Sequence, residues 1–274
     1  MTRALMQGLV FCSVVLAIGV ISSSAADVTV EPSERGAVVK IDGELFAEYL
    51  TKSGHQPAVW PIVGPTGKPM TRSYPVGPLL DGEMDDHPHH VSLWFTHGDV
   101  NRRDFWRSNE ESRQDNQIEH REFVETSSQG DTATIVTRND WIADGKKIAE
   151  DERTLVFGAD DSGRWIDFTV RLKATEGDIT LGETKEGSFG VRVNAPLTVD
   201  SRKGARIVNN RGQVDEAAWG QFAEWVDDSG PVDGEVVGIA MFSHPQNFRH
   251  PTRWHARSYG LLAANPFGDA EFGP

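Results

Sequence analysis

The sequence predicts an all-β protein that folds as a single large antiparallel β-sandwich. Three observations support this prediction. Apolar and polar residues alternate with a period of two in many short segments, turn-forming residues separate these segments, and helical periodicity is nearly absent. The pattern is typical of sandwiches and barrels, because alternate side chains of a strand point to opposite faces of its sheet.

The clearest strand is the segment WIDFTVRL at 165–172, in which apolar residues alternate with polar ones. This pattern indicates a strand with one buried face and one exposed face. Turn signals such as SSQGD and GADDSG separate neighbouring segments, so residues 118–172 predict an antiparallel meander. Further short strands are expected at 38–42, 91–95, 118–126, 132–141, 147–157, 179–183, 189–193 and 235–243.

Two segments depart from this strand pattern. Residues 54–84 are rich in glycine and proline and predict long loops that cross a sheet face, where functional sites are often built. Residues 215–225, DEAAWGQFAEW, form the only stretch that could make a short helix, and Gly220 weakens it.

The N-terminal residues 1–26 have the features of a secretory signal peptide. A short basic start precedes an apolar run, and the small residues Ser24 and Ala26 match a cleavage site. A membrane anchor is the alternative, but the apolar run is short of the roughly 20 residues that a spanning helix needs. We therefore expect a periplasmic or secreted protein, with one β-sandwich domain over residues 27–274.

Cysteine usage and the C-terminal end add two further expectations. The only cysteine, Cys12, lies in the predicted signal, so the mature chain has no thiol for a disulfide, a metal site or a nucleophile. The chain ends in polar, glycine and proline residues directly after the apolar run YGLLAA. Because a sandwich usually ends with another strand, we expect the sequence to be truncated at its C-terminus.

The charge of the chain limits the class of partner. Its 41 acidic residues outnumber its 27 basic ones, which gives a formal net charge of −14. Such a surface repels phosphate backbones and anionic lipids. Nucleic acid is therefore excluded as an expected partner, and a carbohydrate or another neutral small molecule fits better.

The densest chemistry lies in residues 85–106, DDHPHHVSLWFTHGDVNRRDFW, which hold four of the nine histidines. We expect a strand from the histidines to Phe95, with Val91, Leu93 and Phe95 on the core face. His89 would share that face, whereas His90 would share the opposite face with Ser92 and Trp94. The following turn would present His97, Asn101, Asp104 and Trp106.

A second cluster lies far away in the sequence, at 242–268, and holds three more histidines. Seven of nine histidines thus fall into two segments, and we infer that these segments meet in space to form one cleft. Imidazoles suit proton transfer near neutral pH and metal binding. Aromatic rings beside amides and carboxylates suit a sugar, because the rings stack on it and the polar groups bind its hydroxyls.

General acid–base chemistry is the leading interpretation of the two clusters. We expect His89 or His90 to act with His255 or His244 as acid and base, and Glu186 to be their carboxylate partner. The expected substrate-binding residues are Trp94, His97, Asn101, Asp104, Trp106, Arg192, Asn247, Arg249, Trp254, Arg257 and Tyr259. A metal site with His87 and His89 as ligands is an alternative, since two histidines on one strand face are a familiar ligand pair. No cofactor is required by the sequence, and a divalent metal stays open.

Three motifs make the chain similar to a bacterial family of unknown function that commonly carries the label "methane oxygenase PmoA": HPHHVSLWFTHGDVNRRDFW, ETKEGSFGVRV and SHPQNFRHPTRWHARSYGLLAANPFG. The customary VNG of that family is VNR here, with Arg102 in place of glycine. The resemblance implies a supersandwich similar to galactose mutarotase-like proteins, an architecture that hosts aldose epimerases, polysaccharide lyases and glycosidase accessory domains. The label itself does not fit, because a genuine particulate methane monooxygenase subunit is a multi-helix membrane protein.

Together these features predict an exported carbohydrate-active protein with a histidine-rich cleft. An isomerase, a lyase and a hydrolase all remain open, although a histidine-centred site favours proton transfer over hydrolysis by paired carboxylates. A non-catalytic glycan-binding module and a histidine-ligated metal-dependent enzyme are the alternatives.

Overall fold

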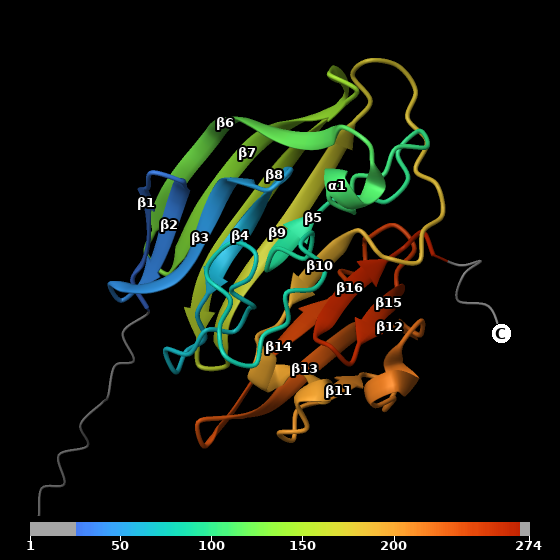
Figure 1. Cartoon of the computed structure of the whole chain (residues 1–274). Coiled ribbons are helices and arrows are strands. Elements are labelled where there is room, and N and C mark those ends of the chain that lie inside the picture. The colour runs from blue at the N-terminus through green and yellow to red at the C-terminus, as the bar shows by residue number, and fades with distance from the viewer. Residues whose placement is uncertain (1–25, 269–274) are drawn as a thin grey trace, which may run out of the picture.

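The computed structural model describes residues 26–268 (Figure 1). Most of the predicted signal peptide and the chain end at 269–274, including the expected truncation, lie outside these described residues. No helix between residues 26 and 268 is long and apolar enough to span a membrane.

The chain forms one large antiparallel sheet and two smaller ones. The large sheet has nine strands in the order β1-β2-β3-β4-β5-β10-β16-β15-β12. Their bounds are Val28–Pro32 (β1), Gly36–Ile41 (β2), Glu44–Ser53 (β3), Gln56–Ile62 (β4), Leu93–Phe95 (β5), Phe189–Arg192 (β10), Leu261–Asn265 (β16), Thr252–Arg257 (β15) and Phe222–Ala223 (β12).

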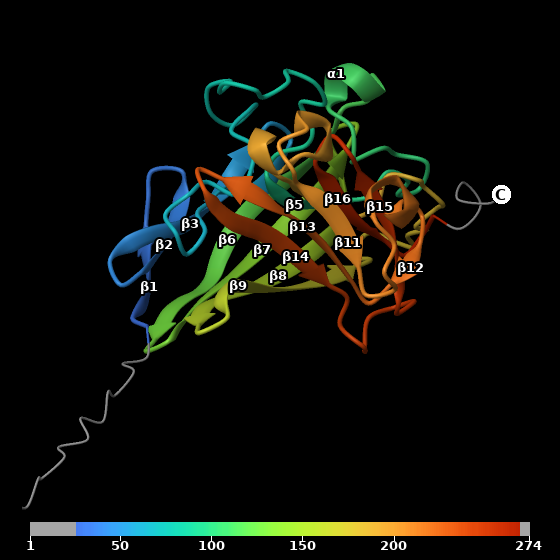
Figure 2. The same ribbon diagram turned by 90° about the horizontal axis from the view of Figure 1, so that it is seen from below.

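The remaining strands form a meander and a small three-stranded sheet. The meander, as predicted for residues 118–172, comprises Asn116–Gln129 (β6), Thr132–Ala143 (β7), Lys146–Asp160 (β8) and Gly163–Lys173 (β9). The small sheet comprises Arg206–Asn209 (β11), Trp225–Val232 (β13) and Glu235–Phe242 (β14), which lie near β15 and β16 (Figure 2). The described helices are Asn109–Ser112 (α1) and the 3-10 turns Ala195–Leu197, Val199–Ser201 and Asp215–Ala218.

One hydrophobic core joins all three sheets. Tyr49 and Leu262 of the large sheet, Ile135 and Phe157 of the meander, and Val226 of the small sheet are all buried in it. Apolar faces of sheets packed on one another define a sandwich. The predicted all-β sandwich is therefore confirmed.

Strand register divides the large sheet into two different faces. One row across β5, β10, β16 and β15 faces the core; it consists of Leu93, Val191, Leu262 and Ala256. The next row consists of Trp94, Gly190, Ala263 and His255. Since neighbouring residues of a strand point to opposite faces, this second row faces away from the core. The long connections 63–92 and 96–115, which include α1, run alongside this part of the sheet (Figure 1).

The predicted strand through the histidines is wrong for most of its length. Only Leu93–Phe95 form a strand, and residues 87–92 are a loop. His87 has a φ of 44° and Ser92 a φ of 73°, which lie in the left-handed region and cannot continue a strand. The backbone N–H of His90 donates to the carbonyl of His87, which closes a turn instead.

Three other local predictions are corrected. Residues 54–84 contain strand β4 as well as loops, and residues 179–183 make only an isolated bridge at Leu181. The predicted helix 215–225 is reduced to a 3-10 turn over Asp215–Ala218 followed by β12. Asp215 has a φ of 53° and its side chain accepts a hydrogen bond from the backbone N–H of Ile207, which fixes a turn at the point where a helix would begin.

A buried ion pair connects the meander to the large sheet next to the histidine loop. Asp151 accepts hydrogen bonds from Arg153, Asn139 and the indole N–H of Trp141, and both charged side chains are almost fully buried. Arg153 also donates to the carbonyl of Phe95 at the end of β5. A charge pair in such a place is held by its mutual attraction and by the hydrogen bonds around it.

We predict that Arg153→Ala lowers the free energy of unfolding by roughly 3–5 kcal/mol, because it leaves the Asp151 carboxylate buried and uncompensated. Urea unfolding followed by tryptophan fluorescence measures this loss. Arg171→Ala is the matched control: its side chain on β9 is 70 % exposed and pairs with Glu152, so the expected change is within about 1 kcal/mol. Equal losses in the two variants would contradict the role assigned to the buried pair.

Candidate functional site

The outward face of β5 and β10 carries a stack of aromatic rings above a glycine. A Cβ atom at Gly190 would lie 2.9 Å from Cη2 of Trp94 and 3.3 Å from Cη2 of Trp106, so only glycine leaves room for both indoles. The two indole centroids are 5.1 Å apart. His90 stacks on Trp94 at 5.4 Å with an interplanar angle of 23°.

The ring of His87 packs against both His90 and Tyr259, whose own ring centroids are 6.3 Å apart. The ring of His87 lies 4.8 Å from that of His90 at 3° and 5.1 Å from that of Tyr259 at 11°. Trp94 and His90 are fully buried, whereas 40 % of the His87 side chain is exposed. Residues from the two histidine segments therefore meet where the partly exposed His87 stacks on Tyr259.

Two buried arginines beside these rings share one carboxylate. Oδ1 of Asp86 accepts hydrogen bonds from Nη1 of Arg72 at 2.6 Å and from Nη2 of Arg192 at 3.0 Å. Burial alone would raise the pKa of Asp86, but Arg192, His87 and Arg72 outweigh it and lower that pKa. Asp86 thus compensates part of the charge of both arginines.

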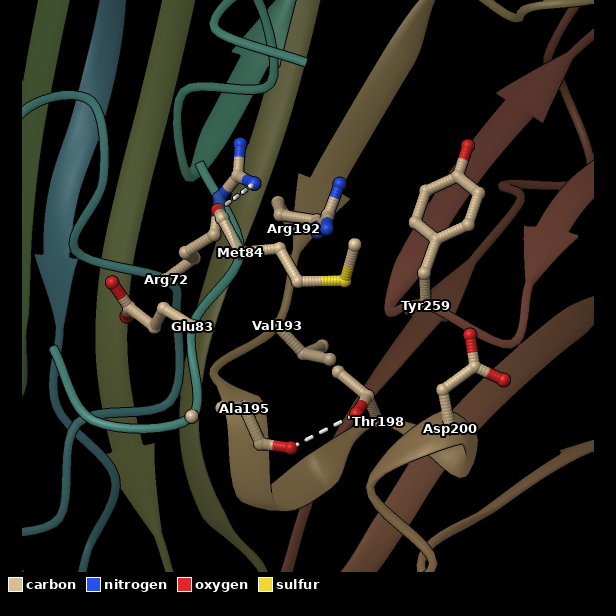
Figure 3. A pocket seen from close by; sticks show the side chains of 10 residues that line it. Arg72, Glu83, Met84, Arg192, Val193, Ala195, Thr198, Asp200 and Tyr259 are labelled. Atoms are coloured by element: carbon tan, nitrogen blue, oxygen red, sulfur yellow. Dashed lines mark hydrogen bonds between the residues drawn. The ribbon is translucent and has the colours of Figure 1, made fainter. Parts of the chain in front are cut away.

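A pocket opens beside these arginines. Figure 3 shows Met84 extended in front of Arg192, with Tyr259 on the far side and Val193 below. The Arg192 guanidinium lies 4.7 Å from the Tyr259 ring centroid, and burial raises the pKa of the Tyr259 hydroxyl. The pocket wall is therefore a neutral phenol between cations.

The hydrogen bond from Arg192 fixes the protonation of His90. Arginine only donates, so Nδ1 of His90, 3.1 Å from Nη1 of Arg192, must accept. Burial, with the charges of His89 and Arg192, lowers the pKa of His90 well below its usual value. His90 is therefore neutral and enclosed, which makes it a support for His87 and His89 rather than a group that meets a ligand.

His89 forms a dyad with a carboxylate. Its Nδ1 lies 2.6 Å from Oε2 of Glu111, which also accepts hydrogen bonds from the backbone N–H and hydroxyl of Ser108 in a capping box at the start of α1. Burial would raise the pKa of Glu111, but Ser108 and His89 outweigh it and lower that pKa. An ionised carboxylate only accepts, so His89 carries its proton on Nδ1 and presents a lone pair on Nε2.

His255 has the opposite arrangement. The indole N–H of Trp219 donates to Nδ1 of His255 at 3.1 Å, and Nε2 of His255 lies 3.7 Å from Oε2 of Glu186. Because the indole only donates, a neutral His255 carries its proton on Nε2. Burial, aided by the charges of Arg257 and Lys185, lowers the pKa of His255 to about 3.

Both histidines are neutral at neutral pH and lie on the same side of the sheet. Burial lowers the pKa of His89 to about 4, although Glu111 opposes the shift. Trp106 lies 6.3 Å from the His89 ring, and the adjacent Arg107 comes within 3.8 Å of Glu186 beside His255. The site thus combines a proton acceptor at His89 with a hydrogen-bond donor at His255.

The structure brings ten of the expected residues into this region: His87, His89, His90, Trp94, Trp106, Glu186, Arg192, His255, Arg257 and Tyr259. The ring of Tyr259 also lies beneath the guanidinium of Arg257 at 5.6 Å. Both indoles are buried under His90, so they support the site and do not offer an open face to a sugar ring.

Four of the other expected residues have structural contacts elsewhere. His97 is buried between Ser188 and the carbonyl of Gly182, and Asp104 accepts from the backbone N–H of Trp106 and Arg107. Asn101 lies in an exposed turn and bonds to Thr180. Trp254 packs in the core, on the opposite face of the sheet from His255.

The loop before β15 is also separate from the histidine cluster. His244, Asn247 and Arg249 are exposed there, and Arg249 donates to the carbonyl of Pro266. Of the second cluster, the later part from His255 to Tyr259 is therefore the part that lies near the histidines of the first.

Sequence reasoning missed Glu111, Trp219 and Arg72. The spacing Ser108-x-x-Glu111 is a capping-box signature and could have revealed α1, but not the contact with His89. Trp219 and Arg72 stood in segments predicted as helix and loop, with no local sign of their partners. Among residues 26–268, no group of three or more histidine, aspartate or glutamate side chains is arranged to hold a metal ion.

Comparison with known proteins gives a family but no function. A family model described as "Family of unknown function (DUF6807)" matches residues 36–274. No curated protein and no solved structure matches the chain.

We predict that acid destabilises the protein through His255. Its folded pKa of about 3 lies below the ordinary unfolded value of about 6.5, so the unfolded state binds more protons and stability falls as pH drops below 6.5. Between pH 7.5 and pH 5 this contributes a loss of about 2 kcal/mol. Urea unfolding of the wild type and of His255→Gln should show a loss that is smaller in the variant by that amount. Identical pH dependences would refute the buried neutral state.

Proposed function

The chain belongs to a family of unknown function, DUF6807, and from this premise we propose that it is an exported carbohydrate-active protein in which His89 is the general base and the neutral His255 donates a hydrogen bond to the oxygen that gains negative charge. The observation that carries the proposal is the opposite kind of hydrogen-bond partner of these two imidazoles on one side of the sheet: Nδ1 of His89 meets a carboxylate, and Nδ1 of His255 meets an indole N–H. A carboxylate holds one proton on Nδ1, and an indole leaves the other on Nε2.

The role of each histidine follows from these two arrangements. Nε2 of His89 accepts a proton from a hydroxyl or C–H group of the sugar, while the Nε2–H of the neutral His255 donates a hydrogen bond to a sugar oxygen and stabilises the negative charge that develops there. Glu111 stabilises the imidazolium that forms at His89, and Trp219 holds the ring of His255 in place. The imidazolium of His89 then returns its proton to the sugar or to water, and His255 keeps its own proton throughout. Ring opening, epimerisation and elimination all fit this scheme, and none of them needs an electron acceptor.

The surroundings support a sugar as the substrate. The side chain of His87 is 40 % exposed and stacks on Tyr259, with Arg257 and Glu186 close by. Planar groups next to charged hydrogen-bonding groups can stack on a sugar ring and bind its hydroxyls. The sequence resemblance to galactose mutarotase-like proteins also points to a sugar, and the signal-peptide pattern points to export. Both are part of this proposal. So is the view that the methane oxygenase label is a misnomer.

We predict that His89→Ala and His255→Ala each reduce turnover by about 10²–10⁴-fold, the usual contribution of one positioned base or of one hydrogen-bond donor to a developing negative charge. Purified protein is incubated with a panel of reducing sugars and oligosaccharides in D₂O. Proton NMR then reports anomer exchange, loss of C–H signals and new unsaturated products for the wild type and the variants.

His244→Ala is the matched control for that experiment, because this exposed histidine was the alternative to His255 and lies outside the cluster. Its turnover should stay within about twofold of the wild type. Saccharide binding without turnover would instead identify a glycan-binding module, and wild-type turnover in both cluster variants would refute acid–base catalysis at this site.

A further inference from the structure

A second pocket lies on the same strand as His255. It is lined by Arg211, Phe222, Arg249, His250, Pro251, Arg253, Asn265 and Pro266, which we call the arginine pocket. Arg253 precedes His255 by two residues on β15, so both side chains leave the same face of the sheet about 7 Å apart. The register of β15 pairs Arg253 with Phe222 on β12 and with Asn265 on β16.

The charge of the arginine pocket opposes that of the whole protein. Three arginines and a histidine line it, and no acidic residue among residues 26–268 does so, although the chain carries a net charge of −14. Arg211 and Arg249 form no ion pair with any of residues 26–268. Guanidinium groups without carboxylate partners in a concave site attract an anion by focusing the local field.

The apolar part of the arginine pocket suits a ring. The side chain of Phe222 is 40 % exposed, and the guanidinium of Arg253 lies 4.2 Å from its ring centroid. Pro251 and Pro266 supply further apolar surface. The cavity volume of about 550 Å³ is within the range of small-molecule sites, about 300–1,000 Å³.

We propose that the arginine pocket binds the carboxylate of an acidic saccharide, such as a uronic acid residue. Arginine and carboxylate form paired N–H···O hydrogen bonds, while the aromatic and proline surfaces contact the sugar ring. Because the chain has a net negative charge, its surface outside the arginine pocket repels anions. The saccharide part of this inference rests on the proposed function, whereas the anion part rests on the arginines alone.

Isothermal titration of the full chain with D-glucuronate, D-glucose and inorganic sulfate tests this inference. Glucuronate should bind, and Arg249→Gln and Arg211→Gln should each weaken it by at least tenfold, because a hydrogen bond to a charged group is worth about 1.5–3 kcal/mol. Arg171→Gln, on β9 of the meander, removes the same charge from a distant exposed position and should leave the affinity unchanged.

Three results would overturn the inference: glucose binding as tightly as glucuronate, sulfate binding as tightly as glucuronate, or undiminished binding in both arginine variants. The double variant His89→Ala/His255→Ala is titrated in parallel and should bind glucuronate like the wild type. Glucuronate binding without any sugar turnover would therefore contradict the proposed catalysis and support the arginine pocket. Sugar turnover without glucuronate binding would support the catalysis and contradict the arginine pocket.

Discussion

Side-chain alternation across β5, β10, β16 and β15 determines which residues enter the core and which face the histidine site. The row Leu93, Val191, Leu262 and Ala256 enters the common core. The adjacent row therefore faces outward, and it carries His255 at one end and Trp94 at the other. A shift of register by one residue would exchange the two rows. Because the core packing fixes the strand register, it also fixes the positions of His255 and Trp94.

Burial and charge then set the state of the histidines. Arg72 and Arg192 are buried next to His90, and a single carboxylate, Asp86, is bonded to both. A charged imidazole in this place would be desolvated and repelled, which keeps His90 neutral. His89 is neutral for the same reason of burial, but its bond to Glu111 lets it take up a proton when a substrate requires it.

The parts of the fold that depend on local pattern were predictable, and the parts that depend on distant contacts were not. Short segments of residues 118–172 alternate between apolar and polar residues, clearest at 165–172, and they form the predicted meander, because both strand faces leave a trace in the sequence. Strand β16, LLAAN, has no alternation, since its outward residues, Leu261 and Ala263, must be apolar to support Trp94 and Trp106. The loop at residues 87–92 was predicted as a strand because His87 and Ser92 have positive φ angles although neither is a glycine, the residue that usually marks such positions in a sequence.

For the site, the sequence located the two histidine segments and correctly included Tyr259 and His255 among residues that the structure brings near His87. It could not separate His255 from His244, since only the pairing of β15 with β16 shows which histidine lies on the strand. Nor could it find Glu111 or Trp219, which fix the protons, because each lies more than 20 residues from its partner in sequence.

The opposite protonation of His89 and His255 can be measured directly by nitrogen NMR of the protein labelled with ¹⁵N-histidine at pH 7, with His89→Gln and His255→Gln used for assignment. Two neutral imidazoles are expected, with the proton on Nδ1 in His89 and on Nε2 in His255. A charged imidazole at either position, or the same tautomer at both, would contradict the assignment of His89 as base and His255 as hydrogen-bond donor.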